Sequence, residues 1–162
     1  MSEIHAVTSE DEAAILALNN DNATELSWLT PLRLCTLIAS AFHVRRVGAV
    51  EAFMMAFDQD ARYDSPNFQW FRNRYERFVY VDRVVVAASA RGKGHGRRLY
   101  DDLFVHAARA RHPLVTCEVN SRPPNPASDA FHAALGFSVV GEATLGDDKA
   151  VRYYVRTLHR AA

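Results

Sequence analysis

The sequence lacks the features that mark several common protein classes. Its 19 basic and 19 acidic residues give a formal net charge of zero, so no electrostatic argument favours nucleic acid or a membrane surface as a partner. No apolar run approaches the ~20 residues that span a bilayer, and the first residues lack the apolar core of a secretory signal peptide. We therefore expect a cytoplasmic protein that binds neither nucleic acid nor membranes.

Cysteine is scarce and histidine is scattered along the chain. Cys35 and Cys117 have neither CxxC nor metal-ligand spacing, so two reduced thiols are expected rather than a disulfide framework. The 7 histidines show no paired spacing of the kind found in zinc sites. We expect no metal ion in this protein.

The composition suits one globular domain. A chain of 162 residues is long enough to bury a substantial core. Its apolar fraction of 49% and charged fraction of 23% are ordinary for a soluble domain. Neither internal repeats nor low-complexity linkers divide the sequence. We therefore expect residues 1–162 to form a single domain.

The spacing of apolar residues predicts a mixed α/β protein. Helical spacing favours helices over 9–18, 31–41, 95–111 and 125–135, with a break at 19–24 after the first of them. Apolar runs rich in β-branched and aromatic residues favour strands over 4–7, 42–47, 50–57, 78–86, 115–119, 138–143 and 151–158. Gly48 lies between the second and third of these strands and predicts a hairpin there.

Residues 58–76 form the longest segment without clear periodicity. Segments of this length inside a compact domain tend to be functional or disordered, and the aromatic content argues against disorder. Two interpretations stay open: a loop that tucks its aromatic side chains into the core, or a wall of a substrate site. In the second case Asp58, Asp60 and Asp64 would place acidic groups at the mouth of that site.

A glycine-rich turn is the most informative stretch of the sequence. It consists of Arg91, Gly92, Lys93, Gly94, His95 and Gly96, between the apolar strand end Val84, Val85 and Val86 and a predicted helix. Strand, glycine turn and helix together form an arrangement that holds phosphate. Glycine lets the backbone approach closely, and the N–H groups of the first helical turn point at the anion.

Two common nucleotide-binding motifs do not match this turn. A P-loop places Ser or Thr after its lysine to hold a magnesium ion, whereas Gly94 follows Lys93 here. A dinucleotide-binding fingerprint requires a further glycine three residues after its second one, near the start of the chain. Arg97 occupies that position, past the midpoint of the sequence.

The turn instead resembles the (Gln/Arg)-x-x-Gly-x-(Gly/Ala) signature of the GNAT acetyltransferase superfamily, with Arg91, Gly94 and Gly96 at the specified positions. This resemblance is strong over 78–140 and rests on the order of elements before that. It implies a GNAT-type α/β (α+β) fold with a mixed, mostly antiparallel central sheet and helices on both faces.

A second motif of that superfamily reads Asn-x-x-Ala-x-x-x-Tyr-x-x-x-Gly-Phe. The stretch from Asn125 to Phe137 is similar to it without a gap, with Ser128 in place of Ala and His132 in place of Tyr. Gly136 also suits the residue after a helix end. The two motifs occur in the order expected for the superfamily.

The resemblance implies acetyl-CoA as a co-substrate. In GNAT proteins the turn holds the pyrophosphate of the coenzyme, which here implies a cradle formed by Arg91, Gly92, Lys93, Gly94, His95, Gly96 and Arg97. The resemblance also implies that the backbone at Val84, Val85 and Val86 pairs with the pantetheine arm. Asn125 and Ser128 would contact the coenzyme at the start of the later helix.

Acetyl transfer to an amine requires that the ammonium group lose a proton and that the leaving thiolate be stabilised. His132 stands where GNAT enzymes keep a tyrosine near the coenzyme sulfur, so its imidazolium is the candidate proton donor. A half-buried helix histidine that only packs is the alternative. Asp82 and Glu118, on neighbouring strands, are the candidate bases, and a salt bridge to an arginine elsewhere is the alternative role for each. Strand alternation places Tyr80 on the face of Asp82 and Arg83 on the opposite face.

The sequence thus predicts an acetyl-CoA-dependent N-acetyltransferase that moves the acetyl group directly from the thioester to an amine. Two alternatives stay open: a non-catalytic acyl-CoA-binding or sensory domain on the same fold, and a transferase for a longer acyl chain. Small amines, amino acids, antibiotics and proteins all stay open as acceptors, and a homodimer is compatible with the sequence.

Overall fold

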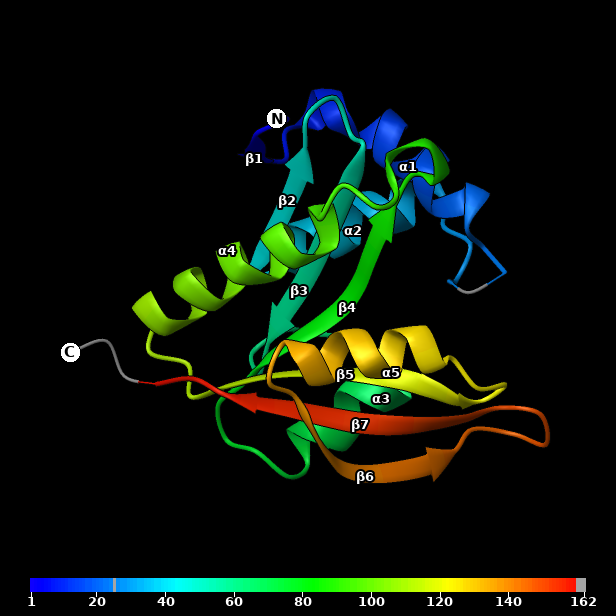
Figure 1. Cartoon of the computed structure of the whole chain (residues 1–162). Coiled ribbons are helices and arrows are strands. Elements are labelled where there is room, and N and C mark those ends of the chain that lie inside the picture. Colours follow the sequence, from blue (N-terminus) through cyan, green and yellow to red (C-terminus); the bar gives the residue numbers. More distant parts are fainter. Residues whose placement is uncertain (25, 160–162) are drawn as a thin grey trace.

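One sheet of seven strands organises the protein, whose computed structural model describes residues 1–24 and 26–159 (Figure 1). The strand order is β1-β2-β3-β4-β5-β7-β6. The strands are β1 (Ile4–Ala6), β2 (His43–Val47), β3 (Ala52–Asp58), β4 (Val79–Val86), β5 (Leu114–Arg122), β6 (Ser138–Thr144) and β7 (Ala150–Thr157). Neighbouring strands are antiparallel except β4 and β5, which are parallel. The mostly antiparallel sheet expected from the resemblance is confirmed.

Helices in the described residues cover both faces of this sheet, as expected. They are α1 (Glu12–Asp21), α2 (Pro31–Ser40), α3 (Pro66–Arg72), α4 (His95–Arg109) and α5 (Pro126–Ala134). One core contains Leu99 and Leu103 of α4 together with Leu135, which follows α5. The opposite core contains Ile15 of α1 and Leu34 of α2, together with apolar residues of α3. None of the described helices is long and apolar enough to cross a membrane.

The segment 58–76 contains a helix, α3, that apolar periodicity did not predict. Its start has a local signal, because the Ser65 hydroxyl accepts a hydrogen bond from the Phe68 N–H at 3.4 Å and Pro66 occupies the first helical position. The helix has only 7 residues, which is too short for a 3.6-residue period to stand out.

The aromatic residues of α3 belong to the core, as the first interpretation of this segment holds. Phe68 and Phe71 are fully buried, and the ring of Trp70 stacks on Tyr153 of β7 with centroids 4.1 Å apart. This packing fixes the helix beneath the sheet, beside β4 and β7 (Figure 1). A side chain on the sheet-facing side of α3 therefore has a defined position relative to those strands.

The first helix is longer than predicted. It continues through Asn19 and Asn20 to Asp21, where the sequence pattern favoured a break. Asparagine side chains disfavour helices by competing for nearby backbone groups. Here the amides of Asn19 and Asn20 bond instead to the backbone of Ser27 and Leu29, beyond the helix end.

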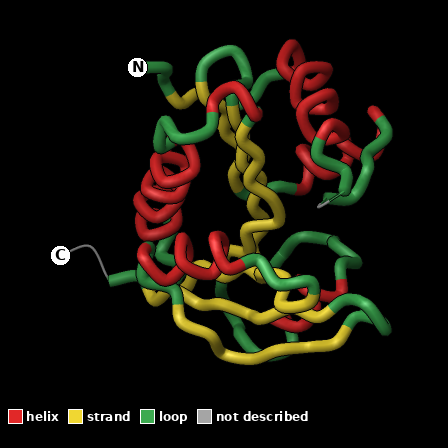
Figure 2. The backbone as a smooth tube through the Cα atoms, turned by 45° about the vertical axis from the view of Figure 1, so that its right-hand side comes forward, coloured by secondary structure: helices red, strands yellow, loops and turns green. Residues whose placement is uncertain are grey.

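The sheet divides into two halves at β4 and β5. These strands pair only at Val79 with Val115 and at Tyr80 with Thr116. Beyond that point they separate, which Figure 2 shows as a widening space between the backbone of β4 and that of β5 and α5. Each strand stays anchored on its far side, β4 by β3 and β5 by β7, so the separation is a stable feature of the fold.

A β-bulge interrupts β4 where the strands separate. Met55 of β3 pairs with Arg83, whereas the next residue, Ala56, pairs with Val81, and Asp82 is the extra residue between them. The bulge resets the alternation of side chains, because Val81 and Val84 both pack into the core beneath α4. Strand alternation therefore does not hold across Asp82 and Arg83.

Candidate active site

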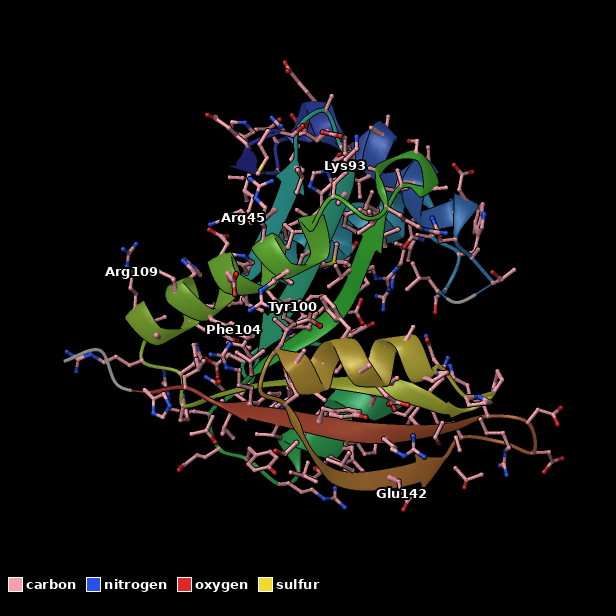
Figure 3. The ribbon with its side chains drawn as sticks, viewed as in Figure 1. Arg45, Lys93, Tyr100, Phe104, Arg109 and Glu142 are labelled. Carbon is pink, nitrogen blue, oxygen red and sulfur yellow. The ribbon has the colours of Figure 1, made fainter. Side chains whose placement is uncertain are left out.

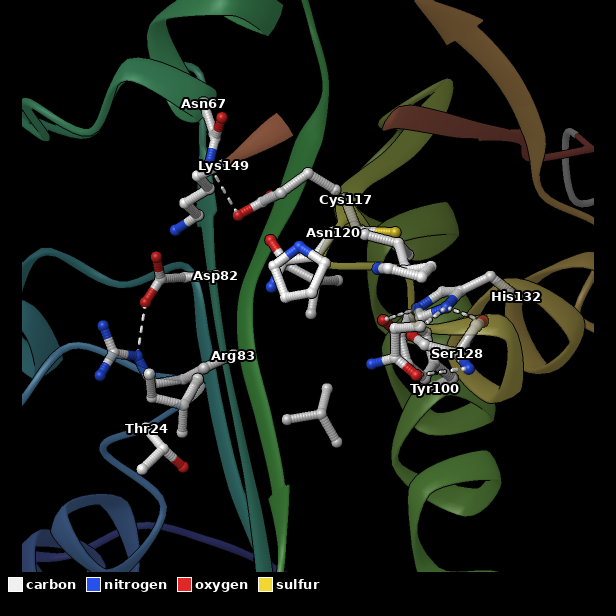
Figure 4. Close-up of a pocket in the computed structure, with 18 of the residues that line it drawn as sticks. Thr24, Asn67, Asp82, Arg83, Tyr100, Cys117, Asn120, Ser128, His132 and Lys149 are labelled. Atoms are coloured by element: carbon white, nitrogen blue, oxygen red, sulfur yellow. Dashed lines mark hydrogen bonds and ion pairs between the residues drawn. The ribbon is translucent and has the colours of Figure 1, made fainter. Parts of the chain in front are cut away.

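A cleft of about 660 Å³ occupies the space between β4 and β5. Its lining comes from both strands, from α4 and α5, from Asn67 of α3, and from the connections between α1 and α2 and between β6 and β7. The predicted site residues that line it are Asp82, Val84, Glu118, Asn125, Ser128 and His132. Figure 4 shows Asp82 on one wall and Ser128 and His132 on the opposite wall.

Val85, Val86 and the predicted residues of the glycine-rich turn lie outside the cleft lining, beyond Val84 along β4 and its continuation. Val84, Val85 and Val86 pair with Met54, Phe53 and Ala52 of β3. On their other edge they pair with no strand of the described chain, because the bond pattern to β5 ends at Tyr80. The backbone groups on that edge are therefore available to a ligand, while the side chain of Val85 is buried in the core.

The glycine-rich turn joins β4 to α4 with two residues in the left-handed region. Gly92 has φ +81° and Gly94 has φ +79°, a conformation that side chains other than glycine rarely adopt. Gly94 caps α4, and the first helical bond runs from the Arg98 N–H to the Gly94 carbonyl at 3.1 Å. The preceding N–H groups of the first turn have no helical partner. Free N–H groups at a helix N-terminus suit an anion such as phosphate.

The side chains of the turn have different surroundings from one another. His95 is buried, with Nε2 3.6 Å from Glu51 Oε1, so its backbone rather than its ring is accessible to a ligand. Lys93 is mostly exposed and lies 3.7 Å from the same carboxylate. Figure 3 places Lys93 at the N-terminal end of α4, far from the labelled Tyr100. Glu51 thus ties the turn to the β2–β3 connection.

The carboxylate of Glu118 on β5 is surrounded by hydroxyl and amide side chains. The Tyr80 hydroxyl donates to its carboxylate at 2.8 Å, and Asn67 Nδ2 donates at 3.0 Å. Asn67 is held in turn by the Tyr153 hydroxyl, which donates to its Oδ1 at 2.8 Å. Burial raises the pKa of Glu118 to about 7, although the hydrogen bond from Tyr80 opposes this rise. The carboxylate can therefore exchange a proton near neutral pH.

Asp82 has a different environment, and one expectation about it was wrong. Arg83 does not point away from it: Arg83 Nε donates to Asp82 Oδ2 at 2.6 Å, because the bulge brings both side chains to one side of β4. The Tyr63 hydroxyl donates to the other carboxylate oxygen at 2.6 Å. Asp82 thus forms a salt bridge, with the adjacent Arg83 rather than with an arginine elsewhere in the sequence.

His132 is buried between α4 and α5. Its Nδ1 lies 2.8 Å from the Ser128 carbonyl oxygen, which can only accept, so Nδ1 carries the proton. Its Nε2 then accepts from the Tyr100 hydroxyl at 2.9 Å. Burial lowers the pKa of His132, although the bond to the Ser128 carbonyl opposes this. The ring is neutral at neutral pH and has no proton on the nitrogen that faces Tyr100, in contrast to the imidazolium expected from the sequence.

Tyr100 and Asn67 are site residues that the sequence analysis did not find. Tyr100 sits on α4, lines the cleft and contacts His132, which lies 32 positions later in the chain. Asn67 sits on α3 and reaches Glu118 across 51 positions. Neither contact follows from local spacing. The Ser-Pro start of α3 was the one local signal that could have indicated a helix near Asn67.

The acidic mouth expected from the segment 58–76 does not form. Asp58, Asp60 and Asp64 do not line the cleft, and Asp64 is 92% exposed beside Arg33. Their segment contributes Asn67 to the cleft instead. The exposed charged residues of the cleft lining include Asp148 and Lys149, from the turn between β6 and β7.

The comparisons with known proteins agree with this architecture. Residues 37–137 match the model of a family described as the acetyltransferase (GNAT) family. No curated protein matches the sequence significantly. An N-acetyltransferase from Staphylococcus aureus Mu50 shares 20% identity and a TM-score of 0.76, over 98% of this chain and 99% of that chain.

Two further solved structures extend this likeness. The ribosomal-protein-S18-alanine N-acetyltransferase from Escherichia coli is 14% identical with a TM-score of 0.75, over 100% of this chain and 97% of that one. A phosphinothricin acetyltransferase from Sinorhizobium meliloti, in complex with acetyl-CoA, is 17% identical with a TM-score of 0.71, over 97% and 88% of the two chains. The matched sequence covers more than half of the chain, and together with the fold it places this protein in the GNAT acetyltransferase family.

Proposed function

We propose that this protein is an N-acetyltransferase that uses acetyl-CoA and acts on a small amine. The observation that carries the proposal is the cleft between β4 and β5. The free edge of β4 leads from it to a helix N-terminus suited to phosphate, and a carboxylate with a pKa near neutrality lies on its β5 side. Coenzyme binding and proton removal thus have separate places along one groove.

The coenzyme would lie along β4. The unpaired edge at Val84, Val85 and Val86 suits the amides of a pantetheine arm, and the turn from Arg91 to Arg97 suits its pyrophosphate. Asn125 accepts a hydrogen bond from the Ser128 N–H at 3.2 Å and caps α5, and both residues line the cleft, so a second helix start borders it. The solved relative in complex with acetyl-CoA supports this choice of co-substrate.

Glu118 is the better candidate for the base. Asp82 pairs with the charged Arg83 and accepts from Tyr63, whereas Glu118 accepts only from the neutral Tyr80 and Asn67, and burial raises its pKa to about 7. A base of that strength can take the proton from an ammonium group at neutral pH, directly or through water. The nitrogen lone pair then forms the C–N bond as the C–S bond breaks, and the thiolate leaves.

The leaving thiolate needs a proton, and the pair formed by Tyr100 and His132 lies on the wall opposite Asp82. With the proton of His132 on Nδ1, the Tyr100 hydroxyl donates to Nε2, and it would turn from Nε2 to give this proton to the sulfur. His132 would orient the hydroxyl rather than act as the acid itself. No nucleophilic residue takes part in this scheme, so Cys117, which is buried and lines the cleft, is not needed as an acyl carrier.

Activity is expected to follow the ionisation of Glu118. Its carboxyl group is protonated below pH 7 and cannot act as a base, so kcat should rise between pH 6 and 8 with an apparent pKa of about 7. Glu118→Gln should lower kcat on the order of 10²–10⁴-fold without changing the Kd of acetyl-CoA. Thiol release measures the first effect and calorimetry the second. The matched control is Glu142→Gln on β6, and a Glu118→Gln protein with wild-type kcat would rule out this base.

The glycine turn is expected to control coenzyme affinity. Gly94 has φ +79°, with open space around the position of an added Cβ, so a valine would strain the turn and cover the N–H groups behind it. Gly94→Val should raise the Kd of acetyl-CoA at least ~10-fold, about 1.4 kcal/mol.

Lys93→Ala is the control for this effect and should raise the Kd less, because exposed charges contribute little. Circular dichroism must show a native fold for both variants. A folded Gly94→Val protein with wild-type affinity would place the coenzyme elsewhere.

Tyr100 and His132 are expected to act as one unit. Tyr100→Phe removes the proton and His132→Phe removes its acceptor, so each should lower kcat by roughly 10²-fold with a smaller effect on the KM of acetyl-CoA. The double variant should be little worse than either single one, because effects within a unit are not additive. If instead the loss of kcat in the double variant equals the product of the two single losses, the two residues act independently and the pairing is wrong.

A further inference from the structure

A continuous chain of polar contacts runs from the cleft wall into the opposite layer of the protein. Arg83 Nε donates to Asp82 at 2.6 Å, and Arg83 Nη1 donates to Asn19 Oδ1 on α1 at 2.8 Å. The Tyr63 hydroxyl holds the second oxygen of Asp82. Asn19 is fully buried and Arg83 nearly so, so the contacts between these two side chains are shielded from solvent.

This series of contacts ends on the backbone that precedes α2. Asn19 Nδ2 donates to the Ser27 carbonyl at 3.0 Å. The side chain of the neighbouring Asn20 forms two hydrogen bonds with the backbone of Leu29. It accepts from the Leu29 N–H at 2.9 Å and donates to the Leu29 carbonyl at 3.0 Å. Asn19 Nδ2 also donates to Asn20 Oδ1 at 3.1 Å. The two amides thus form a clamp on residues 26–29, and the clamp is linked through Arg83 to Asp82.

The clamped residues, Ser27 and Leu29, follow a stretch that borders the cleft. Leu26, immediately before Ser27, lines it, as does Thr24 at the end of the preceding turn. Figure 4 shows Thr24 beside Arg83 and Asp82 on one wall, across from Tyr100, Ser128 and His132. This wall faces the proposed sulfur-protonating pair across the cleft, so it borders the space left for the acceptor. The same connection reaches the glycine turn through Asn22, whose Oδ1 accepts from Arg91 Nη2 at 3.5 Å.

Burial gives the chain of contacts its strength. A guanidinium group out of water needs its partners, because an unpaired buried charge is costly. Arg83 has Asp82 on one side and Asn19 on the other, and Asn19 can satisfy Arg83 with its oxygen only while its amide nitrogen faces Ser27. The orientation of one buried amide therefore couples the ion pair to the position of the segment.

We propose that Asp82, Arg83 and Asn19 are positioning residues that hold residues 26–29 against the acceptor end of the cleft and so set the affinity for the acceptor. This inference rests on the proposed function and adds to it a role for Asp82 other than that of a base. Asp82 does not accept the acceptor's proton; it fixes Arg83, which fixes Asn19, which fixes the cleft wall at Leu26.

The test uses two variants, each of which disrupts a different contact in the series that runs from Asp82 to Ser27. Asn19→Asp keeps an oxygen for Arg83 but replaces the donor to Ser27 with an oxygen, so it releases the segment while the buried arginine keeps a partner. Asp82→Asn weakens the anchor of Arg83. The matched control is Asp11→Asn at the other end of α1, where Asp11 pairs with Arg46 at 2.8 Å away from the cleft lining.

Two readouts are compared. Steady-state thiol release should show an acceptor KM raised at least ~10-fold in Asn19→Asp and Asp82→Asn, with kcat within about threefold of wild type and the Kd of acetyl-CoA unchanged. Hydrogen exchange of the peptide that contains residues 26–29 should be faster in both variants and unchanged in Asp11→Asn. Circular dichroism confirms that each variant is folded.

Other outcomes overturn the inference. A large loss of kcat in Asp82→Asn, with unchanged acceptor KM and unchanged exchange, would make Asp82 the base. Faster exchange in Asn19→Asp with an unchanged acceptor KM would show that the segment does not touch the acceptor. A wild-type protein that binds acetyl-CoA but transfers to no amine refutes the proposed function, and with it the acceptor role, while exchange still decides whether the anchor exists.

Discussion

The separation of β4 from β5 after Tyr80 is the constraint on which the rest of the site depends. Each strand is tied on its outer side to an antiparallel neighbour, so the gap persists without a ligand. It leaves one edge of β4 without a strand partner, which soluble proteins normally cover or blunt. Here the free edge leads directly into the glycine turn and α4, and a coenzyme that pairs with the edge reaches the helix N-terminus. The incomplete pairing of β4 with β5 thus leaves an extended groove in the sheet, which the proposed coenzyme would occupy.

Two carboxylates border this groove, and their different surroundings are the basis of the roles proposed for them. Asp82 sits at a β-bulge with an arginine and a tyrosine on its two oxygens, which suits a fixed structural charge. Glu118 has only neutral hydrogen-bond donors, and burial raises its pKa to about 7. Pairs of acidic groups whose environments differ in this way can divide positioning and proton transfer between them. The α3 helix matters to this division because it supplies Asn67, one of the donors to Glu118.

The parts of the site that were predictable from the sequence are those encoded by contiguous residues. The turn around Gly94 and the helix that starts at Asn125 are short motifs, and the positive φ of Gly136, +88°, agrees with a helix end there. The missed features join distant positions. The pair of Tyr100 and His132 requires two helices to meet, and α3 is too short for periodicity. The side chain of Arg83 was predicted on the wrong face of β4. The bulge at Asp82 depends on how β3 pairs with β4, and the sequence of one strand does not reveal that pairing.

The central claim is that the cleft transfers an acetyl group rather than only binding a coenzyme. The most direct test incubates the wild-type protein with acetyl-CoA and a panel of small amines, and follows free thiol together with the mass of each amine. We predict thiol release that depends on the amine and equals the amount of acetylated amine formed. Tight binding of acetyl-CoA with no thiol release across the panel would contradict the claim and favour a binding or sensory role on the same fold.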